Sequence, residues 1–264
     1  MDKSAVRIIF KEVSHMAFLP VFFLILYLLF SVCDCIWALK RAHLESGRLK
    51  LSEVNQKLAA IYTRRFRTLK FCLMPLLLLF YLMSCRFGWP LTGMIRSQNI
   101  SWLIILALIS GWAGDTLLEV SPKLFPAGLG AFLLGHIFYI IAFASPFFSM
   151  SAPKKIPLIL ACALMSVVYV VYMIRELLSI EETKPLRIPF GLYLAALALL
   201  FVSASIRLSY RSPLSAGISL LGAALFITSD TLLAFRMFKG SDERGVMPTY
   251  TAAQLLLILG VLLG

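Results

Sequence analysis

The stretch GDTLLEV, at residues 114–120, closes a long apolar run of this chain, and a near copy, SDTLLAF, lies at residues 229–235. Each copy places an aspartate, Asp115 or Asp230, inside an apolar run long enough to cross a bilayer. A carboxyl group at such a depth is costly unless it faces a protein cavity and has a role there. The pair therefore predicts a functional site; the alternative is that each aspartate only caps or pins a helix.

The composition is typical of a helical membrane protein. Of the 264 residues, 60% are hydrophobic and 14% are charged, and the mean hydropathy is +0.89. A soluble domain of this length exposes far more charge. The net charge of +12 does not indicate nucleic-acid binding, because the basic residues lie between apolar spans, where the cytoplasmic loops of membrane proteins carry them.

The apolar runs predict an all-α, polytopic integral membrane protein with one transmembrane domain over residues 1–264. The first run is too long for a signal peptide and lacks a small-residue cleavage site, so we expect an uncleaved first span. Eight spans are predicted, at residues 16–39, 69–87, 101–120, 127–148, 157–178, 189–207, 214–238 and 248–264.

One connection is long, at residues 40–68, and it is rich in Lys and Arg. Its apolar residues recur at helical spacing, which predicts a basic amphipathic helix on the membrane surface. A solvated linker is the alternative. The apolar residues that carry this pattern are Leu44, Leu51, Val54, Leu58 and Ile61.

The distribution of basic residues predicts the orientation. The odd-numbered connections carry 16 of the 25 Lys and Arg residues, against 9 for the N-terminus and the even-numbered connections. We therefore expect the odd-numbered connections to be cytoplasmic and both termini to lie outside. The two DTLL copies lie four spans apart, so their helices run in the same direction, as in a parallel repeat of two four-helix halves. A chance likeness is the alternative.

The polar residues of the spans gather at one depth. With a rise of 1.5 Å per residue, Asp115 lies about 8 Å and Asp230 about 12 Å from the odd-connection ends of their spans. This common layer predicts a pocket open toward that face. The other polar residues in or near the layer are His136, Gln254, Tyr193 and, where the second span opens, Lys70.

Each of these residues also has a structural interpretation. His136 and Gln254 could join helices by hydrogen bonds, and Lys70 could extend to the lipid headgroups. Tyr139, one turn beyond His136, lines the pocket or is a plain interfacial aromatic residue. Asp34 and Glu119 lie near span ends, where water reaches them, and are secondary candidates.

The motifs present favour acid/base chemistry with water. The chain has no Gly-rich phosphate loop, HExxH motif or GxSxG motif. A single His within the spans argues against a histidine metal site, and we expect neither a metal nor a cofactor. The cysteines are expected to be small core residues without disulfides; they are Cys33, Cys35, Cys72, Cys85 and Cys162.

Several short pieces resemble the YhhN-like lysoplasmalogenase family of eight-span membrane hydrolases. The pieces are Lys70 with Pro75, GDTLL at 114–118, GHIFY at 135–139, FITSDTLLAF at 226–235 and TYTAAQ at 249–254. The sequence departs from the family in the basic segment 40–68, which resembles an insertion, and at Arg236 and Met237.

This resemblance implies hydrolysis of the vinyl ether bond of a lysophospholipid substrate, a lysoplasmalogen, within the membrane lipids. Hydrolysis of this bond needs an acid and a base, for which we assign Asp115 and Asp230 in either order, while His136 orients water or shuttles a proton. The residues assigned to the substrate are Lys70, or the basic segment 40–68, at the phosphate, Tyr193, Tyr250 and Gln254 at the glycerol and ether oxygens, and Tyr139 in the pocket wall.

Two rival functions remain open from the residues alone. A transporter or channel would use Asp115 and Asp230 to bind a cation or a proton. The spans that contain them have no internal Pro, and the polar residues mark one layer, not a path through the membrane. A lipid-binding sensor or scaffold would use segment 40–68 but leaves the paired DTLL unexplained.

Overall fold

The computed structural model describes residues 18–46, 53–88, 99–151, 154–178, 180, 187–240 and 244–264. Within these ranges the chain forms eight α-helices and short 3-10 turns, without a strand, which confirms the all-α fold. The helices are α2 (Phe18–Ser46), α3 (Glu53–Phe87), α4 (Trp102–Val120), α5 (Phe125–Phe148), α6 (Ile156–Leu178), α7 (Arg187–Ile206), α8 (Pro213–Lys239) and α9 (Val246–Leu262).

The helices have the lengths that a bilayer requires. In the part of the chain that the structure describes, seven helices are long and apolar enough to cross a membrane, and α9 is a shorter apolar helix of 17 residues. Seventeen residues is the lower limit for a span. Each predicted span coincides with one helix, so the chain is a multi-pass integral membrane protein.

The basic segment 40–68 does not form a helix of its own where it is described. Its first residues continue α2 to Ser46, and its later residues form the start of α3, from Glu53. Residues 47–52, as well as residues 1–17 before the first span, lie outside the described residues. The position of this segment relative to the membrane surface stays a prediction.

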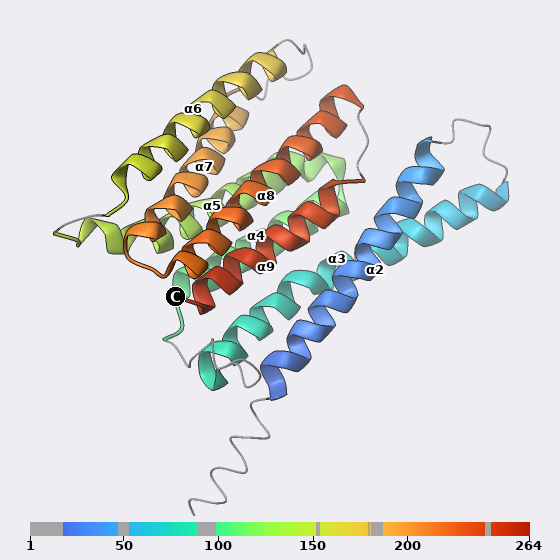
Figure 1. Cartoon of the computed structure of the whole chain (residues 1–264). Helices are drawn as coiled ribbons and strands as arrows, with labels where there is room; N and C mark the ends of the chain where they lie inside the picture. Colours follow the sequence, from blue (N-terminus) through green and yellow to red (C-terminus); the bar gives the residue numbers. More distant parts are fainter. Residues whose placement is uncertain are drawn as a thin grey trace, which may run out of the picture.

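Consecutive helices pack in pairs, α2 with α3, α4 with α5, α6 with α7 and α8 with α9. Figure 1 shows the C-terminal ends of α2, α4, α6 and α8 at one end of the bundle and the C-terminus of the chain at the other. At that other end, Arg211 Nη1 donates a hydrogen bond of 2.5 Å to the carbonyl oxygen of Gly264. Helices α4 and α8 run in the same direction, as expected from the two DTLL copies. The side of the membrane on which each end lies stays a prediction.

Local sequence sets both ends of α8, the helix that carries Asp230. Ser212 precedes the helix, and its side chain accepts a hydrogen bond of 3.2 Å from the backbone N–H of Ser215. Pro213 opens the first turn, where no N–H partner is needed. Gly240 ends the helix in the left-handed conformation, with φ at 64°, which glycine adopts without strain.

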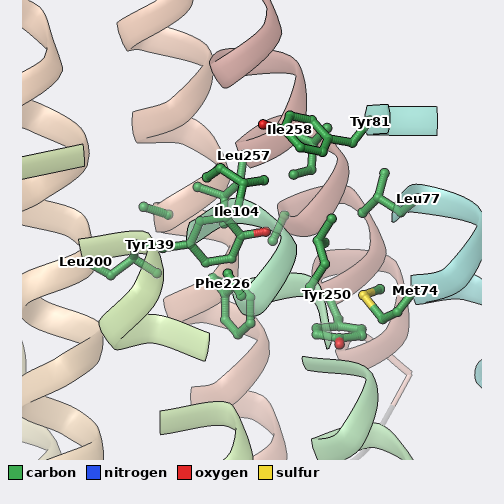
Figure 2. Close-up of a cluster of buried hydrophobic side chains, with 14 of the residues drawn as sticks. Met74, Leu77, Tyr81, Ile104, Tyr139, Leu200, Phe226, Tyr250, Leu257 and Ile258 are labelled. Atoms are coloured by element: carbon green, nitrogen blue, oxygen red, sulfur yellow. The ribbon is translucent and has the colours of Figure 1, made fainter. Parts of the chain in front are cut away.

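Helix α9 lies at the centre of the packing. It contacts α8 along its length and also reaches α2 and α3. Figure 2 shows its residues Tyr250, Leu257 and Ile258 among buried side chains from neighbouring helices. Gly222 lets α8 approach closely, since a Cβ at this position would lie 2.9 Å from the backbone nitrogen of Leu257. The central position of α9 lets residues on it reach toward both α4 and α5.

Candidate active site

A cavity of about 450 Å³ lies among the helices, and both Asp115 and Asp230 line it. Lys70, Glu119 and Arg236 are the other charged residues in its wall. Most of the remaining wall is apolar, including Leu118, Leu129, Phe132, Met173, Leu194 and Phe238. An apolar cavity of this size with a few converging polar groups is typical of a small-molecule site.

Asp115 on α4 is buried and held from two other helices. The hydroxyl of Tyr250 on α9 donates a hydrogen bond of 2.7 Å to Asp115 Oδ2. On the other side, Lys70 Nζ from α3 lies 3.6 Å from Asp115 Oδ1. Lys70 Nζ also donates a hydrogen bond of 3.1 Å to Glu119 Oε1, one turn beyond Asp115 on the same face of α4. Asp115 is therefore part of an ion-pair network at the end of α4.

Asp230 on α8 has a different set of neighbours. The hydroxyl of Tyr193 on α7 donates a hydrogen bond of 2.5 Å to Asp230 Oδ2. His136 Nε2 on α5 lies 3.2 Å from that hydroxyl and 3.7 Å from the same carboxylate oxygen. The His136 ring packs edge-on against Phe226, which fixes its orientation. Asp230, Tyr193 and His136 thus form one hydrogen-bonded group from three helices.

The two aspartates share a plan but differ in their charged partners. Each accepts a hydrogen bond from a tyrosine hydroxyl that also lines the cavity, Tyr250 for Asp115 and Tyr193 for Asp230. Asp115 lies beside the ammonium group of Lys70, whereas Asp230 lies beside the imidazole of His136. The arrangement can therefore hold a charged carboxylate at one side of the cavity and exchange a proton at the other.

Three residues assigned from the sequence lie behind the described cavity wall. His136 reaches the cavity only through Tyr193 and Asp230. The hydroxyl of Tyr139 donates a hydrogen bond of 3.1 Å to Oε1 of Gln254, which lies one helical turn beyond Tyr250 on α9. Tyr139 and Gln254 thus contact each other, and neither is part of the cavity wall itself.

Asp34 is more deeply buried than its position near a span end indicates. It lies on α2 with no solvent exposure, and neither carboxylate oxygen forms a hydrogen bond to the described residues. The charges that act on it are those of Lys70, Asp115 and Glu119. Asp34 therefore belongs to the surroundings of Lys70 and not to the water-exposed surface.

The described residues contain no group of three or more His, Cys, Asp or Glu side chains arranged to hold a metal ion. All five cysteines are free. Cys85 and Cys162 are buried, as expected for core residues, whereas Cys33 is exposed. The polar groups of the described site are therefore carboxyl, hydroxyl, imidazole and cationic side chains.

The sequence did not indicate every residue that lines the cavity. Tyr169 and Met173 of α6 and Phe190 and Phe238 line the cavity, and nothing distinguishes them from ordinary apolar residues of a span. Glu119 was only a secondary candidate. Its spacing of one helical turn from Asp115 was the signal that could have placed it in the site.

Comparisons with known proteins cover most of this structure. The YhhN family model matches residues 66–261, from within α3 to nearly the end of α9. Mouse lysoplasmalogenase TMEM86B (Mus musculus) is 33% identical over 166 residues, which are 61% of this chain and 64% of the mouse protein. The aligned part is thus less than two thirds of that relative. No solved structure matches. The match extends over both aspartates and every helix from α4 to α8, and the chain therefore belongs to the YhhN family.

Proposed function

We propose that the protein is a membrane-embedded hydrolase that cleaves the vinyl ether bond of lysoplasmalogens. The products are a fatty aldehyde and glycerophosphoethanolamine or glycerophosphocholine. The observation that carries this proposal is that Asp115 and Asp230, from separate helices, line one cavity with an otherwise mostly apolar wall. The mouse relative named lysoplasmalogenase supports the choice of substrate.

The chemistry of a vinyl ether fits two carboxyl groups. Protonation of the outer alkenyl carbon produces an oxocarbenium ion next to the ether oxygen. Water then adds to the oxocarbenium carbon and gives up a proton, and the resulting hemiacetal collapses to an aldehyde and a free glycerol hydroxyl. One group must donate a proton and another must accept one, as in glycosidases.

We assign the acid to Asp230 and the base to Asp115. Asp230 can regain its proton through Tyr193 and His136, which lie within hydrogen-bond distance of each other. Asp115 lies in an ion pair with Lys70, which suits the partner that remains charged, orients water and stabilises the oxocarbenium ion. The hydrogen bond from Tyr250 fixes the direction of the Asp115 carboxylate.

The position of the site suits a lipid with one chain. The alkenyl chain lies along the apolar wall, and the headgroup lies toward Lys70, near the start of the apolar span of α3, and Glu119, at the end of α4. The ether bond then falls between them, at the level of the aspartates.

The test is aldehyde release by the purified full chain in detergent, without any ion gradient. We expect wild type to release aldehyde from 1-alkenyl-glycerophosphoethanolamine, and Asp115→Asn or Asp230→Asn to slow the reaction by about 10²- to 10⁴-fold. Glu176→Gln, at an exposed ion pair with Lys239, is the control and should keep the wild-type rate. Absence of aldehyde from wild type, or full activity of either Asn variant, contradicts the proposal. A transporter would release no aldehyde in this assay.

A further inference from the structure

We infer that Lys70 and Glu119 form a recognition site for a zwitterionic phosphodiester headgroup, in which Lys70 binds the phosphate and Glu119 binds the ammonium group. This inference rests on the proposed function and goes beyond it, because it assigns headgroup selectivity to a residue that the reaction itself does not need. Glu119 is the residue whose role is new.

Both side chains face the cavity and lie next to each other. Lys70 Nζ and Glu119 Oε1 are 3.1 Å apart, and both residues line the cavity wall. Glu119 is the penultimate residue of α4, so it lies at the end of a membrane span. A lipid headgroup lies at this level of the bilayer, whereas the reacting ether bond lies one helical turn deeper, at Asp115.

The single positive charge of Lys70 does not neutralise all of the carboxyl groups that surround it. Among the described residues, Asp115 and Glu119 lie 3.6 Å and 3.1 Å from its ammonium group, and the buried carboxyl group of Asp34 also acts on it. The cavity wall as described holds three carboxyl groups, Asp115, Glu119 and Asp230, beside two cations, Lys70 and Arg236. A buried carboxylate is stable only when paired or hydrogen-bonded, so this excess of carboxyl groups favours a further cation at the site. The ammonium of a bound headgroup supplies that cation.

Accessibility selects Glu119 from the three carboxyl groups around Lys70. Asp34 has no exposure, Asp115 has 2% and accepts a hydrogen bond from Tyr250, and the Glu119 side chain has 14%. A ligand in the cavity therefore reaches Glu119 more readily than the other two.

The headgroup has a matching arrangement of charges. In phosphoethanolamine and phosphocholine, two carbons separate the phosphate oxygen from the positively charged nitrogen. The headgroup can therefore lie along the Lys70–Glu119 pair with each charge facing its opposite. A headgroup without the amine offers no cation to Glu119. The Glu119 carboxylate then stays paired with Lys70 alone and adds nothing to the affinity for that headgroup.

The experiment measures binding of two lysolipids with a saturated ether bond, which the protein cannot cleave. One is 1-O-alkyl-glycerophosphoethanolamine, and the other is 1-O-alkyl-glycerophosphoethanol, which has the same phosphodiester charge and no amine. We expect the wild-type full chain in detergent to bind the amine-bearing lipid about tenfold more tightly, because a hydrogen bond to a charged group contributes this much or more. We expect Glu119→Gln to abolish that preference and Glu119→Lys to reverse it.

The outcomes separate the inference from simpler roles of Glu119. If Glu119→Gln weakens the binding of both lipids equally, Glu119 only positions Lys70 and the inference is wrong. Equal binding of the two lipids by wild type also overturns it. Glu119→Lys serves as a second variant, since its reversal of preference cannot come from partial unfolding. Because these lipids are not substrates, a negative result leaves the aldehyde assay of the proposed function unaffected, and the reverse also holds.

Discussion

The hydroxyl of Tyr250 on α9 donates a hydrogen bond of 2.7 Å to Oδ2 of Asp115 on α4. The two residues are far apart in the sequence, and α9 brings them together because it packs in the middle of the bundle. The orientation of the Asp115 carboxylate therefore depends on the last helix of the chain. This contact and the corresponding Tyr193–Asp230 contact determine what the two carboxyl groups can do.

Tyr250→Phe should lower the rate of aldehyde release by about ten- to a hundredfold while the protein stays folded. The change removes a hydrogen bond to a charged carboxylate, which is worth about 1.5–3 kcal/mol. Steady-state kinetics in detergent measure the effect. Tyr27→Phe is the matched control, since Tyr27 is also buried but its hydroxyl donates to the backbone oxygen of Thr251 at 2.8 Å. A rate for Tyr250→Phe equal to that of the control would argue against a role at Asp115.

His136 should act on Asp230 through Tyr193, which a double-mutant cycle can measure. We expect His136→Asn and Tyr193→Phe each to slow aldehyde release by about tenfold or more, because general acid/base groups contribute about 10²–10⁴-fold. The double variant should be only slightly slower than Tyr193→Phe alone, because members of one hydrogen-bond network are not additive. Fully multiplicative effects would show that His136 acts independently of Tyr193.

Lys70→Met should destabilise the protein more than loss of an exposed ion pair does. Removal of the ammonium leaves Asp115 and Glu119 without the partner that lies 3.6 Å and 3.1 Å away, and breaking a buried pair costs about 3 kcal/mol. Thermal unfolding in detergent should show a melting temperature several degrees lower. Adding Asp115→Asn should restore part of the loss.

The control for this prediction is Lys239→Met. Lys239 pairs with Glu176, and both side chains are about one-third exposed, so its loss should cost at most about 1 kcal/mol. If the two lysine variants unfold at the same temperature, the Lys70 network does not contribute to stability as described.

Gly222→Ala should weaken the packing of α8 against α9. The new Cβ would lie 2.9 Å from the backbone nitrogen of Leu257 and 3.1 Å from the carbonyl oxygen of Ala253, so the helices must move apart. Overpacking of this kind costs about 1–3 kcal/mol. Gly217→Ala on the same helix is the control, because a Cβ there has no heavy atom within 4 Å. Equal melting temperatures of the two variants would contradict the close approach at Gly222.

The separation of α8 and α9 also affects the site, because Asp230 lies on one helix and Tyr250 on the other. We therefore expect Gly222→Ala to slow aldehyde release and Gly217→Ala to leave it unchanged. A destabilised Gly222→Ala protein with the full rate would show that the site tolerates a shift between these helices.

The sequence shows the depth of each site residue in its span, but not whether its side chain lines the cavity. Asp115, Asp230, Lys70, Tyr193 and Tyr250 line the cavity, and they are conspicuous in the sequence because polar residues in apolar spans are rare. His136, Tyr139 and Gln254 share their depth but lie behind the wall. Depth follows from position in a span, whereas the direction of a side chain depends on how each helix is rotated against its neighbours.

Asp34 and Glu119 illustrate the same limit at the ends of spans. The sequence places both near a span end and treats them as accessible to water. In the structure Asp34 has no exposure, whereas Glu119 lines the cavity. The difference arises because the rotation of α2 places Asp34 inside the bundle, and hydropathy contains no information on that rotation.

The sequence alone determined the number, order and approximate bounds of the helices, and the layer in which the polar residues lie. It could do so because a backbone in lipid must satisfy its hydrogen bonds within a helix, so that an apolar run of sufficient length has essentially one structure. Only the tertiary structure decided which tyrosine meets which aspartate, that α9 is central, and that Lys70 bridges Asp115 and Glu119. Such contacts depend on helix rotation and close packing of side chains, and many sequences with the same hydropathy would pack differently.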